Sequence, residues 1–517
     1  MRKLMISLWK HGRAGSPGTD RLSKRGIGSA ARLRRIGLAA GFILLLAPTA
    51  AVQAETSKLP EAVTRQASVR LGDGRSLAYQ VTAGALPVEG PGGELLGEVS
   101  YTAYVAAGQE RARRPVTFAF NGGPGASSVF LHIGLLGPKR VDFAVAGSTP
   151  SDATPLLDNP DTWLAFTDLV FVDPVGTGFS KAHAAPDAAR KHFFGTRQDA
   201  DYLSGFVARW LAKNGRMASP KYLVGESYAG IRVPKMAYRL VKVEGVAVSG
   251  IILLSPLLNS VMSAEPDISP LPWVSRLPSM AATHLERQGK LTDAAMREVE
   301  TYARGDYIRD LMLGREDPAA ATRAADRVAD LIGLPAETVR RLGARVSNLV
   351  YTRELEKEKG VFVSAYDPVV TNFDPYPFSA ERQGDDAILQ GSIAPLTSAI
   401  VHYVTQDIGW KPENTYMTLN IPLNRGWDSG EGLQESVSDL RKAMAMDGNM
   451  KLLISHGYTD LRTPYFASKL AFGQLPPMGD AGRARFTVYP GGHMFYSRAD
   501  SRAAYMRDVR WAYSRGN

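Results

Sequence analysis

Residues 221–230 read Lys-Tyr-Leu-Val-Gly-Glu-Ser-Tyr-Ala-Gly, and this stretch predicts the fold of the chain. The apolar run 222–224 is typical of the end of a buried strand, and the segment 233–241 is amphipathic at helical spacing. A serine on a tight turn of small residues between a strand and a helix is the context of a nucleophile elbow. Such a turn pushes the serine hydroxyl out of the sheet, so Ser227 is the candidate nucleophile.

Two distant loops carry the other groups that such a serine needs. Asp460 follows a predicted strand at 451–455, and His493 follows another at 484–489. The carboxyl ends of parallel strands meet at one edge of a sheet, so these residues are expected to converge on the serine. The histidine would take the serine proton, and the carboxylate would fix the imidazole tautomer. His456 is the chief rival base, but it lies only four residues before Asp460 and lacks a glycine context.

The loop after the predicted strand 116–120 reads Asn-Gly-Gly-Pro-Gly-Ala-Ser-Ser from position 121. Gly122 and Gly123 would let the backbone approach a bound acyl group. The N–H groups of Gly123 and Tyr228 are therefore candidates for an oxyanion hole. Taken singly, each motif also has an ordinary explanation as a turn serine, a loop histidine, a turn aspartate or a Gly/Pro loop.

The order of elements predicts an α/β fold with a mostly parallel central sheet and helices on both faces. Residues 67–106 alternate like antiparallel edge strands, with a break at the Gly/Pro clusters of 83–93. Residues 259–400 lack a buried-strand pattern and are expected to form a helical cap insertion. The core would then comprise 55–258, with the elbow and oxyanion loop, and 401–517, with the Asp and His loops.

Composition excludes several classes of function. The 517 residues carry a formal charge of +10, but residues 1–54 hold ten Lys/Arg and one Asp, which leaves 10 − 9 = +1 for the rest. The residues after 54 are thus nearly neutral overall, and their charge gives no indication of nucleic-acid binding. The absence of cysteine excludes disulfides, thiolate catalysis and Cys-based zinc sites. No metal-ligand cluster or nucleotide fingerprint is visible, so neither a metal nor a cofactor is expected.

Residues 1–54 have the pattern of a targeting segment. A basic stretch ends at Arg35, residues 36–52 are nearly all apolar, and small residues flank the predicted cleavage site after Ala54. We expect a signal peptide and an exported protein, periplasmic or extracellular. The alternative is a retained N-terminal membrane anchor, which would make the membrane a partner. The sequence indicates no oligomeric state.

Five motifs, in this order, resemble the serine carboxypeptidase family: NGGPGASS at 121–128, FVDPVGTGFS at 171–180, GESYAG at 225–230, GYTDLRTPY at 457–465 and GGHMFY at 491–496. The resemblance spans roughly residues 67–513. It implies an α/β-hydrolase fold with a helical insertion. It also implies a serine-type carboxypeptidase that releases C-terminal residues from peptides, usually in acidic conditions.

By this resemblance Ser227, Asp460 and His493 form the catalytic triad of an acyl-enzyme mechanism, and Gly123 and Tyr228 donate to the oxyanion. Asn121 and Glu226 would hold the terminal carboxylate of a peptide substrate. An esterase or acyltransferase on the same fold and triad is the alternative. A non-catalytic binding protein would require a broken triad or oxyanion hole, and neither is visible.

Two departures from the family pattern affect these expectations. Ala126 stands where the family usually has cysteine, and this, with the missing disulfides, suggests a bacterial-type member. Leu135 stands where the family has a second acidic residue, so it cannot share a proton with Glu226. The acid preference should persist but follow a simpler, single-proton curve.

Overall fold

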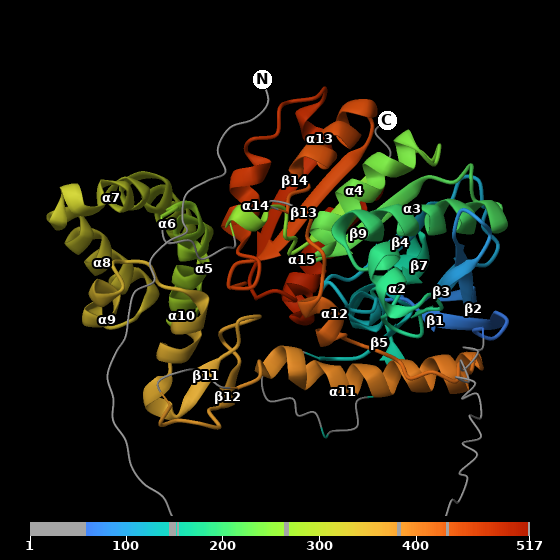
Figure 1. Cartoon of the computed structure of the whole chain (residues 1–517), viewed down its shortest axis with the longest axis horizontal. Coiled ribbons are helices and arrows are strands. Elements are labelled where there is room, and N and C mark those ends of the chain that lie inside the picture. Colours follow the sequence, from blue (N-terminus) through green and yellow to red (C-terminus); the bar gives the residue numbers. More distant parts are fainter. Residues whose placement is uncertain are drawn as a thin grey trace, which may run out of the picture. The chain divides into compact units, whose positions relative to one another are not determined.

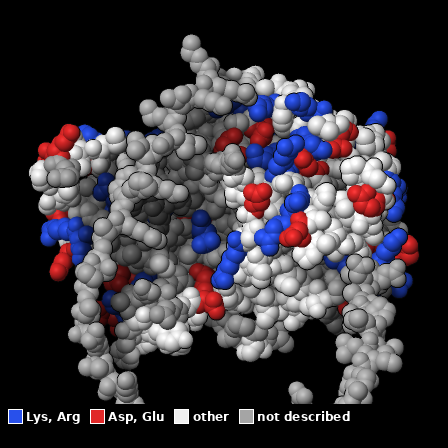
Figure 2. Space-filling model, in the orientation of Figure 1, with Lys and Arg blue, Asp and Glu red and all other residues white. Residues whose placement is uncertain are grey.

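The computed structural model describes residues 58–143, 151, 155–262, 268–379, 384–430 and 434–514. The predicted leader and its cleavage site lie outside the described residues. On the face shown in Figure 2, basic and acidic side chains are intermingled.

A ten-stranded sheet forms the centre of the structure, in the order β1-β2-β3-β7-β4-β9-β10-β13-β14, with β8 paired to β3 (Figure 1). From β7 to β14 neighbouring strands are parallel, whereas β1, β2, β3 and β7 pair antiparallel. The predicted, mostly parallel central sheet is confirmed. The bounds are β1 Val63–Arg70, β2 Ser76–Glu89, β3 Leu95–Ala106, β4 Val116–Phe120, β7 Asp168–Val172, β8 Lys181–Ala182, β9 Lys221–Glu226, β10 Gly250–Leu254, β13 Lys451–Gly457 and β14 Ala484–Tyr489.

The central strands bury both of their faces, because alternate side chains enter two different apolar clusters. In β9, Val224 joins one cluster and Leu223 the other. In β10, Ile252 joins the first cluster and Ile251 the second. This explains why these strands are continuous apolar runs in the sequence.

Helices cover both faces of the sheet, as predicted. The second cluster contains side chains from α2 (Pro186–Phe193), α3 (Thr196–Lys213), α4 (Ala229–Lys242) and α13 (Val437–Met446). The first cluster contains side chains from α1 (Val129–Leu131), η1 (His132–Leu136), η2 (Trp163–Ala165), α11 (Ala387–His402) and α15 (Ala499–Tyr513). The sheet therefore lies between two helical layers.

The antiparallel edge differs from the prediction, because β2 continues through the Gly/Pro region instead of breaking at residue 83. Position 84 requires glycine, because an added Cβ would lie only 2.5 Å from the Cβ of Ala62. Pro87 pairs with Glu98 of β3, while the pairing with β1 ends at Ala83. Pro87 therefore lies where β2 has no partner on its other side, and proline is tolerated at such an edge.

Most of the segment between β10 and β13 is helical, and its side chains form most of a third apolar cluster, to which Leu461, Tyr465 and Phe466 contribute from beyond β13. The segment also contains a short antiparallel hairpin, β11 (Val361–Val363) with β12 (Thr371–Phe373), that the sequence pattern did not indicate. Before this hairpin, the α-helices and one π-helical turn are α5 Leu271–Arg287, α6 Asp293–Tyr302, η4 Ala303–Tyr307, α7 Ile308–Leu313, α8 Pro318–Ile332, α9 Ala336–Arg341 and α10 Asn348–Glu354; α11, α12 (Ile421–Arg425) and α13 follow it.

The expected cap boundary at residue 400 falls inside α11. Leu396 and Ile400 of this helix are buried in the first cluster, so α11 packs with the core. With the π-helical turns that follow it, Ala387–Ile408 is the one helix among the described residues that is long and apolar enough to cross a membrane. The side chains that this helix buries, among them Ile388, Leu396 and Ile400, lie in the first cluster.

Candidate active site

Ser227 occupies a strained turn between β9 and α4. Its φ of 61° is in the left-handed region, which is rare for residues other than glycine. The neighbouring glycines make room for this turn. A Cβ on Gly225 would lie 2.8 Å from Cγ2 of Val233, and one on Gly230 would lie 2.5 Å from Cβ of Pro256. The small residues of the motif are therefore required by packing around the serine.

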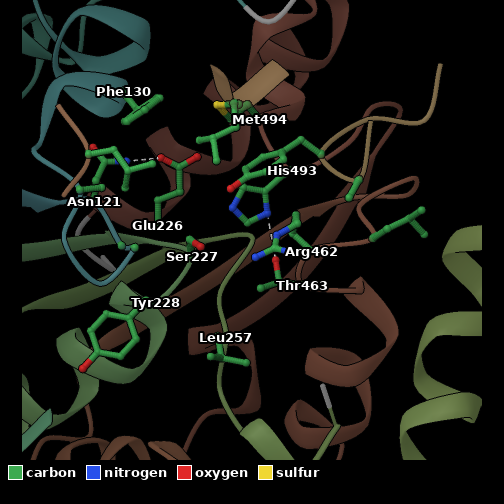
Figure 3. Close-up of a pocket in the computed structure, with 18 of the residues that line it drawn as sticks. Asn121, Phe130, Glu226, Ser227, Tyr228, Leu257, Arg462, Thr463, His493 and Met494 are labelled. Atoms are coloured by element: carbon green, nitrogen blue, oxygen red, sulfur yellow. Dashed lines mark hydrogen bonds between the residues drawn. The ribbon is translucent and has the colours of Figure 1, made fainter. Parts of the chain in front are cut away.

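Asp460 and His493 lie together, in the loops after β13 and β14. Nδ1 of His493 lies 2.8 Å from Oδ2 of Asp460, and both side chains are almost fully buried. Ser227 and His493 line the same pocket, of about 490 Å³, and face it from different loops (Figure 3). No hydrogen bond joins Ser227 Oγ to the imidazole within the described part of the chain, an arrangement common in substrate-free sites.

Thr463 is a member of this cluster that the sequence analysis missed. Its hydroxyl donates to Oδ2 of Asp460 at 2.7 Å and lies 3.0 Å from Nδ1 of His493. The other carboxylate oxygen accepts the backbone N–H groups of Arg462 at 2.8 Å and Thr463 at 3.0 Å. Threonine three residues after the acid, within the turn DLRT, was the available signal.

The helical segment between β10 and β13 contributes directly to the histidine loop. The His493 N–H donates to the carbonyl oxygen of Tyr366 at 2.6 Å, and the Tyr366 ring packs edge-on against the imidazole, with ring centroids 5.1 Å apart. Gly492 permits this contact, because an added Cβ would lie 1.9 Å from the same carbonyl oxygen.

The rival base, His456, lies outside this arrangement. It is fully buried, and both of its ring nitrogens lack a hydrogen-bond partner among the described residues. Burial lowers the pKa of His456 to about 3, which keeps the ring neutral. It stacks on Phe486 and does not line the pocket.

The two candidate oxyanion donors belong to adjoining loops at the pocket wall. Gly123 and Tyr228 both line the pocket, and their backbone N–H groups donate to no acceptor within the described residues. Gly122 lies so close to the elbow that an added Cβ would be 2.5 Å from the Tyr228 nitrogen. Two free N–H groups are thus available beside Ser227.

Glu226 and Asn121 are hydrogen-bonded to each other, with Nδ2 of Asn121 donating to Oε2 of Glu226. Oδ1 of Asn121 accepts the N–H of Leu131 at 3.0 Å, which fixes the orientation of the amide. An amide nitrogen carries two donors, so the second N–H of Asn121 remains for a ligand. Both residues line the pocket (Figure 3).

Tyr496 is the second residue that the sequence analysis missed. Its hydroxyl donates to Oε1 of Glu226 at 2.8 Å. Leu135, at the position of the family's second acidic residue, is buried in the first apolar cluster and does not line the pocket. In place of a second acidic residue, Glu226 therefore has the phenol of Tyr496, which lies in the stretch GGHMFY.

Burial and neighbouring charges set the protonation of the site. Burial would raise the pKa of Asp460, but the charge and hydrogen bond of His493 outweigh it and hold the pKa below its ordinary value. Burial would lower the pKa of His493, yet Asp460 raises it above the ordinary value. Burial raises the pKa of Glu226 to about 7, against the opposing effects of His493, Tyr496 and Asn121. Glu226 can therefore carry a proton in mildly acidic solution.

Comparison with known proteins gives a family match over one segment. Residues 97–274 match the family model described as "Serine carboxypeptidase". The chain is 37% identical over 130 residues to serine carboxypeptidase-like 50 of Arabidopsis thaliana, which is 25% of this chain and 27% of that protein. It is 34% identical over 124 residues to pheromone-processing carboxypeptidase kex1 of Talaromyces marneffei, 24% of this chain and 18% of that protein. These alignments therefore span about a quarter of each relative, or less.

A solved structure extends the likeness to most of the chain. Kex1(delta)p, a prohormone-processing carboxypeptidase from Saccharomyces cerevisiae, superposes with a TM-score of 0.54 over 84% of this chain and 91% of that chain, at 16% identity. The chain thus has the α/β-hydrolase fold, as expected. The relatives named here are plant and fungal, so they lend no support to the expectation of a bacterial-type member.

Proposed function

We propose that this chain is a serine-type carboxypeptidase, which releases C-terminal residues from peptides through an acyl-enzyme. The observation that carries the proposal is the position of Glu226 and Asn121 in the same pocket as Ser227 and His493. A hydrolase with only a nucleophile and a base would cleave many acyl compounds. Donors for a carboxylate beside the nucleophile select a substrate that ends in a free carboxyl group.

In the proposed mechanism, Nε2 of His493 accepts the proton of Ser227 Oγ as this oxygen attacks the scissile carbonyl. Asp460 accepts a hydrogen bond from Nδ1–H of His493, so Nε2 is left to act as the base. The negative charge of Asp460 stabilises the imidazolium. The backbone N–H groups of Gly123 and Tyr228 bind the negative oxygen that develops. The imidazolium then protonates the leaving amine, and the C-terminal amino acid departs.

The second half of the reaction uses the same groups. A water molecule gives a proton to His493 as its oxygen attacks the acyl-serine, and the oxyanion again lies against Gly123 and Tyr228. Collapse of this intermediate breaks the bond to Ser227 Oγ, which recovers its proton from the imidazolium. The products are a shortened peptide and one amino acid.

Recognition of the terminal carboxylate would favour acidic pH. An ionised Glu226 accepts hydrogen bonds but cannot donate one, and it would repel a carboxylate. Protonated Glu226 and Asn121 can both donate to the substrate. Because the pKa of Glu226 is about 7, the donor form predominates below that pH.

The test compares three matched N-blocked dipeptide substrates: the free acid, its amide and its ester. Purified protein should release the C-terminal amino acid from the free acid most efficiently, and Ser227→Ala should abolish the release. Turnover of the ester while the free acid is left intact would favour the esterase or acyltransferase alternative on the same triad.

Two finer proposals follow from the sequence. The pattern of residues 1–54 supports an exported enzyme, periplasmic or extracellular, with cleavage after Ala54. The absence of cysteine supports a bacterial-type member. Mass spectrometry of the protein from its native cell tests the first proposal, since the exported form should begin at Glu55. An intact N-terminus in the membrane fraction would favour a retained anchor.

A further inference from the structure

Among the described residues that line the pocket, one side chain carries a permanent positive charge, that of Arg462. The other two strongly ionisable side chains that line it, Glu226 and His493, titrate and are held by partners of their own. The rest of the described lining is mainly glycine, alanine, leucine and aromatic residues. A cation in such a setting attracts a negatively charged group of the substrate.

Arg462 has no carboxylate partner of its own, since it makes no ion pair within the described part of the chain. Its backbone N–H donates to Oδ1 of Asp460, which fixes the start of the side chain. Its guanidinium lies 5.6 Å from the centroid of the Tyr366 ring, and that ring packs edge-on against His493. The side chain is exposed, so the guanidinium remains accessible next to the imidazole.

Two carboxylates whose charges act on Tyr366, those of Asp460 and Asp386, already accept hydrogen bonds from other donors. The carboxylate of Asp460 accepts from His493, Thr463 and two backbone N–H groups. Asp386, whose charge also reaches Tyr366, accepts the hydroxyl of Ser364 and the backbone N–H of Ala365. Neither carboxylate pairs with Arg462.

The position of Arg462 indicates which part of a peptide it would contact. Figure 3 shows it on the opposite side of Ser227 and His493 from Asn121 and Glu226. In the proposed function, Asn121 and Glu226 hold the terminal carboxylate, and Ser227 attacks the preceding carbonyl. The residue on the far side of the serine is then the one that supplies that carbonyl, the penultimate residue of the peptide.

We propose that Arg462 makes this site select peptides whose penultimate residue is aspartate or glutamate. A guanidinium can bind a carboxylate through two parallel hydrogen bonds, which a neutral amide of the same shape cannot match. Leu349 and Leu461, which also line the pocket, offer apolar surface for the methylene groups of such a side chain. This inference rests on the proposed carboxypeptidase function.

The test uses N-blocked dipeptides that end in leucine and carry Glu, Gln or Lys at the penultimate position. Released leucine is measured at pH 6, where a substrate glutamate is ionised. The parent should prefer Glu over Gln by about fivefold in kcat/KM, since the pair is partly exposed to solvent. Lys should be the poorest substrate. The preference for Glu should shrink as ionic strength rises.

Arg462→Gln should bring the Glu to Gln ratio to about one, and Arg462→Lys should retain part of the preference. Arg441→Gln is the matched control, because it removes the same charge from an exposed position on α13 that does not line the pocket. This control should keep the ratio of the parent.

Three results would overturn the inference or its premise, and they are distinguishable. An unchanged ratio in Arg462→Gln would refute the role of Arg462 while leucine release upheld the carboxypeptidase. If Arg462→Gln lowered kcat/KM equally for all three free-acid substrates but left turnover of their C-terminal amides unchanged, Arg462 would bind the terminal carboxylate instead. No leucine release from any substrate by the parent would refute the proposed function itself.

Discussion

The hydroxyl of Tyr496 lies 2.8 Å from Oε1 of Glu226, and the amide of Asn121 donates to the other oxygen of the same carboxylate. Two donors therefore stabilise the ionised form of a side chain whose burial favours the protonated form. The pKa of Glu226 is about 7 as a result, so this side chain gains or loses its charge near neutral pH. A phenol that stays protonated across this range leaves Glu226 to titrate without a second carboxyl group.

Replacement of Tyr496 by phenylalanine removes one donor to ionised Glu226 and should raise the pKa of this carboxyl further. The pH at which KM for free-acid peptides begins to rise should then move upward by about one pH unit. KM against pH for matched acid and amide substrates measures the shift. Tyr505→Phe is the control, because the buried Tyr505 hydroxyl has no hydrogen-bond partner among the described residues. A downward shift would contradict the assignment.

The pH profile of the parent should be bell-shaped for free-acid peptides and one-sided for amides. Raising the pH deprotonates His493, which supplies the base, and also deprotonates Glu226, which removes a donor for the carboxylate. Activity on acids should therefore fall above about pH 7 through KM. Activity on amides should rise with pH and then stay level.

Glu226→Gln keeps a donor at every pH, so KM for free-acid peptides should lose its rise above about pH 7. The amide substrates should behave alike in parent and variant. If KM follows the same curve against pH for acid and amide substrates, in both the parent and Glu226→Gln, Glu226 does not recognise the carboxylate. That result would favour the esterase alternative.

Ser227→Ala should lower kcat by about four to six orders of magnitude, because the members of a triad act as a unit. Stability should change little, since alanine preserves the packing of the turn. A phosphonylating serine reagent, followed by peptide mass spectrometry, should label Ser227 in the parent alone. Label on a different serine would show that the nucleophile has been assigned wrongly.

Thr463→Val removes the hydroxyl that donates to Asp460 while it keeps the shape of the side chain. Loss of a buried hydrogen bond to a charged group should lower stability by about 1–3 kcal/mol. We expect a fall in kcat of about tenfold, with KM nearly unchanged, because the imidazole is less firmly oriented. Thr463→Ser should restore most of both quantities in thermal unfolding and kinetic assays. A rise in KM as large as the fall in kcat in the valine variant would indicate a general distortion of the pocket.

The elbow and the sheet around it could be predicted from the sequence because their signals are local. The glycines beside Ser227 and the apolar strand before them form one continuous stretch of sequence. Gly225 is required by Val233 in the helix that follows, although Gly230 is required by Pro256, farther along the chain. The edge strand β2 was harder to delimit, because Gly84 and Pro87 usually mark turns. Only the position of β3 and the early end of the pairing with β1 make them acceptable within a strand.

By itself the sequence determined the α/β class and the candidates Ser227, Asp460 and His493, since each follows a strand whose periodicity is visible in the chain. The tertiary structure alone decided the partners of those groups. Tyr496 meets Glu226 from 270 residues away, and the contact of Tyr366 with His493 joins the helical segment to the core. Such contacts leave no periodic trace, because a hydroxyl or a carbonyl becomes a specific partner only when folding brings it within hydrogen-bond distance of a buried charge.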